Sequence, residues 1–168
     1  MDITSIRCFL DRMGCAVKSV NRIQIHADLG RVYEMAADVL EWPRLLSHYR
    51  WVRVVEGRAE DPDCVVEMAA QRDGFPCKWQ ARRTLFPATN RIHYLHTRST
   101  WTRGMDVWWT VEALDGGLVE ARITHEMPPS PNPLVEWFRR FVVGWLFVEN
   151  IADKTLEGLK RHLERGQA

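Results

Sequence analysis

The segment from Asn132 to Arg165 carries apolar residues at the spacing of one long amphipathic α-helix. Asn132 can cap the first turn, and Pro133 suits the first helical position because it has no N–H to leave unpaired. At about 1.5 Å per residue such a helix approaches ~50 Å, which is longer than a small domain needs to close its own core. We therefore expect this helix to lie across a large apolar surface.

Alternating apolar and polar residues predict a first strand from Val17 to Ala27. Asp28 then offers an N-cap for a helix over Leu29–Val39, where apolar residues return to helical spacing. Pro43 limits the next segment, Glu41–Ser47, to a short second helix. The first part of the chain thus predicts one strand followed by two short helices.

Six further strand-like runs fill the middle of the chain, separated by turn residues. They are Tyr49–Glu56, Cys64–Gln71, Cys77–Phe86, Arg91–Thr100, Met105–Leu114 and Leu118–Met127. The Asp-Gly pairs at positions 73–74 and 115–116 are strong hairpin signals. Together with the first strand, these runs predict seven strands in an antiparallel meander.

This order of elements predicts an α+β fold in which a curved antiparallel sheet wraps around the long C-terminal helix. Such packing buries one sheet face and the apolar stripe of the helix together, and it tends to leave a gap between the two layers. We expect a single domain over residues 17–168. Residues 1–16 form an N-terminal extension, either a short amphipathic helix or a loosely ordered arm.

Composition narrows the function classes. The 168 residues carry a formal net charge of +1 with no basic run, which argues against nucleic acid as a partner. The most apolar run, Phe141–Val148, is too short to span a bilayer, and we find no secretory signal. The four cysteines and six histidines show no metal-ligand spacing, so we expect no metal, no cofactor and a cytoplasmic location.

Strand parity predicts which side chains face the gap, if the more apolar set points inward. The predicted ligand-binding residues on the strands are Met68, Trp79, Tyr94, Arg98, Met105, Val107 and Trp109. The first half of the long helix adds its bulky aromatic residues, Trp137, Phe138, Phe141 and Trp145, which we expect to line or gate the pocket mouth. This parity also places Arg83, His96 and His125 on the apolar face.

These last three residues are the candidates for catalysis. A buried arginine is costly without a partner, so Arg83 should pair with a carboxylate or serve a ligand oxygen, although a one-residue bulge would exchange it with Arg82. His96 and His125 have ordinary pKa values near 6.5 and suit removal and return of an α-proton. The alternative for each histidine is a core residue bonded to a backbone carbonyl.

Three stretches, Asp38–Glu56, Thr102–Trp109 and Phe147–Lys160, resemble the START-like, helix-grip superfamily. Within it, the Trp-Pro turn at residues 42–43 and the Gly-Met-Asp-Val-Trp-Trp strand at 104–109 are similar to the polyketide cyclase/dehydrase (aromatase/cyclase) and coenzyme Q-binding branch. The resemblance covers Ser19–Leu163.

This resemblance implies a hydrophobic pocket between the sheet and the helix. In the aromatase/cyclases such a pocket holds a poly-β-ketone tethered to an acyl carrier protein and promotes aldol condensation and dehydration. Their pocket arginine holds and polarises a ketone, and Arg83 matches that position. On this basis Arg83→Ala should abolish product formation and leave the melting temperature nearly unchanged.

Two other functions are open from the sequence, because this superfamily hosts several activities on one scaffold. The first alternative is a non-catalytic carrier or chaperone for a quinone or lipid. The second is a protein-interaction module, against which the balanced charge argues. Convergence of the arginine and the two histidines on one point in the cavity would favour catalysis over simple binding.

Overall fold

The computed structural model describes residues 17–72, 75–99, 102–129, 134, 137 and 149–165. Its elements are β1 (Val17–His26), α2 (Leu29–Ala37), α3 (Trp42–Leu45), β2 (Tyr49–Glu56), β3 (Asp63–Arg72), β4 (Phe75–Phe86), β5 (Arg91–Ser99), β6 (Asp106–Ala113), β7 (Leu118–Met127) and α5 (Glu149–Arg165). Short 3₁₀ turns lie at Pro87–Thr89 and Asp115–Gly117. Each predicted strand is present to within about two residues of its expected ends.

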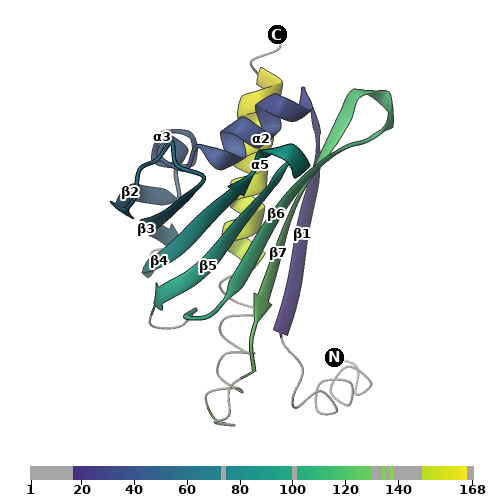
Figure 1. Ribbon diagram of the computed structural model, residues 1–168. Helices are drawn as coiled ribbons and strands as arrows, with labels where there is room; N and C mark the ends of the chain where they lie inside the picture. The colour runs from purple at the N-terminus through teal and green to yellow at the C-terminus, as the bar shows by residue number, and fades with distance from the viewer. Residues whose placement is uncertain are drawn as a thin grey trace, which may run out of the picture.

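The seven strands form one antiparallel sheet in the order β1-β7-β6-β5-β4-β3-β2. Strands β2 to β7 follow one another as a meander, as the sequence predicts. The first strand departs from that meander, because β1 pairs with β7 instead of β2. The sheet curves around α5, with α2 and α3 near one end of that helix (Figure 1). This is the fold class that the sequence predicts.

Asp28 caps α2 as expected, with its Oδ1 accepting a hydrogen bond from the backbone N–H of Arg31 at 3.2 Å. The helix buries Val32, Tyr33 and Ala36. The carbonyl of Ala37, its last residue, accepts a hydrogen bond from the sheet, described below. The short α3 buries Trp42, whose indole N–H donates to the Met35 carbonyl at 3.2 Å.

Helix α5 is fixed to the sheet by both apolar and polar contacts. Its core positions are Ala152, Leu156, Leu159 and Leu163, which are all buried. The amide of Asn21 donates to Asp153 Oδ1 at 2.8 Å, and Lys160 Nζ donates to the Gln24 carbonyl at 2.7 Å. The second half of the predicted helix therefore fastens to edge strand β1.

The first half of the predicted helix lies mostly outside the described residues. The predicted cap at Asn132 and the aromatic positions Phe138, Phe141 and Trp145 lie outside the described residues. The N-terminal extension lies outside them as well. Leu134 and Trp137 are helical, and their exposed fractions are 74% and 58%. Within the described ranges, no helix is long and apolar enough to cross a membrane.

Candidate functional site

A pocket of about 340 Å³ lies between the concave face of the sheet and α5. Most of its lining residues are apolar or aromatic, which is typical of small-molecule sites. The described lining residues are Trp42, Tyr49, Met68, Pro76, Cys77, Lys78, Trp79, Tyr94, His96, Ser99, Thr102, Met105, Val107, Trp109, Ile123, His125, Ile151, Ala152 and Thr155. They come from α3, all strands except β1, the β5–β6 loop and α5.

Eight of the predicted site residues line this pocket. They are Met68, Trp79, Tyr94, His96, Met105, Val107, Trp109 and His125. Alternation along β5 up to His96, and along β6 and β7, turns five of these residues inward: Tyr94, His96, Val107, Trp109 and His125. Met105 lies in the β5–β6 loop, just before β6 begins. The functional roles of these residues stay predictions.

The predicted position of Arg98 in the pocket is wrong, because its side chain is exposed and does not line the pocket. The register of β4 and β5 shifts by one residue: Gln80 pairs with Arg98, but Ala81 pairs with His96. Thr97 is the extra residue, and such a bulge reverses the facing of everything beyond it. Ser99, opposite Trp79, therefore takes the inward place.

The predicted position of Arg83 beside the two pocket histidines is also wrong. It points inward and has an exposed fraction of 3%, but it does not line the pocket with the two histidines. Its guanidinium donates to the carbonyls of Ala37 at 3.0 Å, Ala59 at 2.6 Å and Asp61 at 3.3 Å. The expected ligand oxygen is thus replaced by three backbone oxygens, and Arg83 ties β4 to the end of α2 and to the β2–β3 loop.

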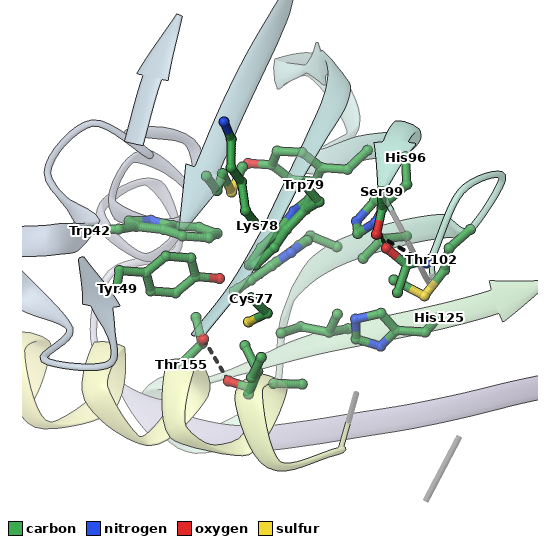
Figure 2. A pocket seen from close by; sticks show the side chains of 18 of the residues that line it. Trp42, Tyr49, Cys77, Lys78, Trp79, His96, Ser99, Thr102, His125 and Thr155 are labelled. Atoms are coloured by element: carbon green, nitrogen blue, oxygen red, sulfur yellow. Dashed lines mark hydrogen bonds between the residues drawn. The ribbon is translucent and has the colours of Figure 1, made fainter. Parts of the chain in front are cut away.

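The pocket has an aromatic side and a polar side. Figure 2 shows Trp42 and Tyr49 on one side, with His96, Ser99, Thr102 and His125 on the opposite side. The rings of Trp42 and Tyr49 meet edge to face, with centroids 5.1 Å apart. This asymmetry would place the apolar part of a bound molecule at one side and its oxygen atoms at the other.

On the polar side, His96 is stacked on Trp79 with ring centroids 5.9 Å apart and an angle of 12° between the rings. Its Nδ1 lies 2.7 Å from the Thr102 hydroxyl. The Thr102 hydroxyl can donate to Nδ1, which then places the ring proton on Nε2. The backbone N–H of Thr102 is itself held by the Ser99 hydroxyl at 3.1 Å.

His125 has no comparable partner. Its Nδ1 is buried, and within the described part of the chain it has no hydrogen-bond partner. A buried polar atom left unpaired costs free energy, so a polar partner for this nitrogen would be stabilising. His125 Nδ1 is thus a fully buried ring nitrogen without a partner among the described residues, whereas His96 Nδ1 has one.

Both pocket histidines are neutral at pH 7. Burial lowers the pKa of His125 to about 3. Burial also lowers the pKa of His96 to about 3, and the nearby His125 adds to that effect. Burial raises the pKa values of Tyr49 and Tyr94 well above the ordinary value, so both phenols stay protonated.

No charged group among the described lining residues points into the pocket. Lys78 is the one charged residue of that lining, and its Nζ lies 2.9 Å from Glu67 Oε1 and 5.6 Å from the Trp51 ring. Figure 2 shows the Lys78 side chain extending away from the pocket. The pocket therefore suits an uncharged ligand with a few oxygen atoms.

Acidification should weaken the fold because His96 and His125 are neutral in the folded protein. Between pH 6.5 and about 3 the unfolded chain binds protons that the folded chain does not, so stability is complete above pH 6.5 and is lost as the pH falls. Each histidine contributes up to about 1.4 kcal/mol per pH unit within that range. Urea unfolding at pH 7, 6 and 5 measures this slope.

The His125→Leu variant is the control for that measurement. It should show a flatter dependence of unfolding free energy on pH, because one of the three histidines with a lowered pKa, His48, His96 and His125, is gone. The range above pH 5 avoids most carboxylate titration, including that of Glu67, whose pKa is held at about 2 mainly by Lys78. An identical slope in both proteins would contradict a neutral, buried His125.

Sequence reasoning missed several pocket residues. Trp42 and Thr155 reach the pocket through the placement of α3 and one face of α5. The helical spacing of Thr155 within the apolar stripe of α5 was the available signal for that residue. The sequence gives no such signal for Ser99 and Thr102, because the direction of their side chains depends on the bulge at Thr97.

A curved seven-stranded sheet that grips a C-terminal helix defines the START-like, helix-grip class of proteins. The chain belongs to the family described as polyketide cyclase / dehydrase and lipid transport, whose model matches residues 25–155. This confirms the family resemblance that the sequence motifs indicate.

One sequence relative is similar to this chain, and two solved structures share its fold. The chain is 31% identical over 121 residues to the granaticin polyketide synthase bifunctional cyclase/dehydratase of Streptomyces virginiae, and the match covers 70% of this chain but only 39% of that relative. The Zhui aromatase/cyclase from Streptomyces sp. R1128 has the same fold, with a TM-score of 0.75, 19% identity and coverage of 91% of this chain and 96% of that one. A START superfamily protein from Mycobacterium smegmatis gives a TM-score of 0.66 at 10% identity, covering 88% and 97%.

Proposed function

We propose that this chain binds an uncharged small molecule with ketone or phenol oxygens between the sheet and α5, and acts on it as a polyketide cyclase-like enzyme. The observation that carries this proposal is the Nδ1 of His125, which has no partner among the described residues, in a pocket whose described lining has no inward charge. The family and the cyclase/dehydratase relative support the same class of ligand.

The role of His125 in this proposal is to hydrogen-bond the ketone oxygen that gains negative charge during aldol condensation. In that reaction an α-carbon gives up a proton to solvent and bonds to a second ketone carbon, whose oxygen takes up a proton to become a hydroxyl. That hydroxyl and a hydrogen of the neighbouring carbon then leave as water. A neutral imidazole can donate one N–H to the oxygen without first being protonated. The charge that develops on the oxygen would in turn favour protonation of the ring, so the same residue can return a proton.

His96 has a supporting role in this proposal. Its Nδ1 is occupied by Thr102, so Nε2 is the atom left for a ligand. Because its pKa is about 3, His96 is a weak base in the empty pocket, and we assign it to orienting the ligand through a hydrogen bond. Delivery of the ligand by an acyl carrier protein stays a prediction from the resemblance.

A non-catalytic carrier for a quinone or lipid is the second candidate. Two observations favour it: Arg83 is bonded to backbone carbonyls away from the pocket, and both pocket histidines have pKa values far below neutrality. A carrier needs only a dry, apolar cavity with satisfied polar groups. Both functions use the same pocket, so the bound molecule and its fate separate them.

Native mass spectrometry of the protein purified from its host tests this choice. We expect a co-purified molecule that fits about 340 Å³ and carries ketone or phenol oxygens. Extraction followed by high-resolution mass measurement identifies its composition. Recovery of an intact isoprenoid quinone or lipid as the main species would contradict the cyclase proposal and support the carrier.

A further inference from the structure

A second concave surface lies outside the pocket, between the α3 segment and one face of α5. Its described lining consists of Pro43, Arg44, Leu45, Leu46, Ser47, His48, Gln71, Lys154, Gly158, Arg161, His162 and Arg165, which we call the basic groove. The α5 members follow one another at steps of four, three, one and three residues, so they share one helix face.

The α3 segment comes close to α5 because Gly158 has no side chain. A Cβ at this position would lie 2.3 Å from Leu46 Cδ2, well inside contact distance, and Leu46 is almost fully buried. Position 158 thus lets the two segments meet at the floor of the groove, with cationic side chains on both walls. This close approach gives the basic groove its concave form.

The basic groove is rich in hydrogen-bond donors and has no carboxylate. Arg44, Lys154, Arg161 and Arg165 supply four positive charges, whereas the whole chain has a formal net charge of only +1. The lining adds two imidazoles, a serine hydroxyl and a glutamine amide. This combination suits an anion with several oxygen atoms, for which the planar guanidinium is well matched.

The carboxylates nearest in the sequence to the groove arginines neutralise only part of the positive charge of the groove. Glu41 forms an ion pair with Arg44, and Glu157 is exposed beside the basic face of α5. Arg161 and Arg165 have no carboxylate partner within the described ranges, and both are exposed. Two arginines one helical turn apart can contact one anion from the same side.

The basic groove also borders the pocket. His48 Nε2 lies 2.9 Å from the Thr155 hydroxyl, and Thr155 lines the pocket while His48 lines the groove. Burial and Lys154 together lower the pKa of His48 to about 4, so its ring is neutral and can donate from Nε2 to Thr155. The hydrogen-bonded pair of His48 and Thr155 therefore lies between the basic groove and the pocket.

We infer that the basic groove is a binding site for a phosphate-bearing ligand, held by Arg161 and Arg165 of α5 with Arg44 on the opposite wall. The groove's concavity and donor set favour a compact, oxygen-rich anion over an extended acidic chain, which would need a longer basic surface. This site is separate from the apolar pocket and does not depend on the function proposed for that pocket.

Titration of the full chain with inorganic phosphate at constant ionic strength, followed by NMR, tests this site. We expect saturable shifts of the His48 and His162 imidazole resonances and little change at His26 and His93, which lie elsewhere. Arg161→Glu and Arg165→Glu should each weaken phosphate binding about tenfold or more, because each removes a charge-assisted hydrogen bond and adds repulsion. Arg31→Glu, an equal charge reversal at an exposed position of α2, should leave the affinity within about twofold.

Three results would overturn the inference. The first is an equal response to chloride and phosphate at the same ionic strength, which would show screening without a site. The second is an unchanged affinity in Arg161→Glu when its melting temperature is that of the parent protein. The third is binding of a poly-glutamate peptide at the groove with no response to phosphate, which would indicate an acidic polypeptide as the partner.

Discussion

Replacing Arg83 with methionine should lower the melting temperature by roughly 6–12 °C. The arginine donates to three backbone carbonyls, in α2 and in the loop that connects β2 to β3, and methionine can donate to none. Hydrogen bonds from a charged group are worth about 1.5–3 kcal/mol each, and partial hydration of the freed carbonyls reduces the total loss to about 3 kcal/mol. For a chain of this length, each kcal/mol corresponds to about 2–4 °C.

The neighbouring arginine supplies a matched control. Arg82 has a half-exposed side chain, with ion pairs to Asp63 at 3.2 Å and Glu56 at 3.9 Å. Surface pairs of this kind contribute about 0–1 kcal/mol, so Arg82→Met should shift the melting temperature by no more than a few degrees. If Arg83→Met instead stays as stable as the parent protein and loses only turnover, Arg83 acts on the ligand, as its match to the cyclase arginine predicts.

Changing His125 to leucine should reduce turnover of a poly-β-ketone thioester by about a hundredfold. Loss of one donor to a developing oxyanion typically costs this much or more. The leucine keeps the pocket filled and apolar, so binding of the substrate should weaken by less than tenfold. Product formation is measured by liquid chromatography with mass detection, and binding by quenching of the pocket tryptophans.

His125→Asn separates a hydrogen bond from proton transfer, because the asparagine amide can occupy the region of the imidazole Nδ1 but has no useful basicity. We expect Asn to restore turnover to within about tenfold of the parent protein. Equal losses in Asn and Leu would point to proton transfer. His93→Gln is the control on the outer face, where His93 is paired with Asp106 and stacked on Trp108. Full activity in His125→Leu would make His125 a wall residue.

The sequence predicts the elements well because their patterns are local. Alternation in β4, β6 and β7 places Trp79, Val107 and His125 on the inward face without knowledge of their neighbours. The pairing of β1 with β7 is different, since it depends on how the sheet curves around α5. A repeating pattern within one strand contains no information about its partner.

The candidate site is less predictable because its chemistry depends on contacts between distant segments. Strand parity correctly predicts that Arg83 points inward. Its three carbonyl partners lie 46, 24 and 22 residues away in the sequence, and no sequence pattern indicates these contacts. The pKa values of His96 and His125 are also set by burial in the complete fold. From the sequence alone these rings look suited to neutral-pH base chemistry, whereas the folded pocket makes them weak bases.

The register shift near the end of β5 has a consequence for comparing relatives. Thr97 and Arg98 both face outward, between the inward His96 and Ser99, so this strand contains one spare residue. A relative that lacks one of these two positions would keep the same pocket face in a regular strand. Alignments of the family should therefore allow a one-residue gap at this point, since an ungapped comparison would equate inward residues of one protein with outward residues of another.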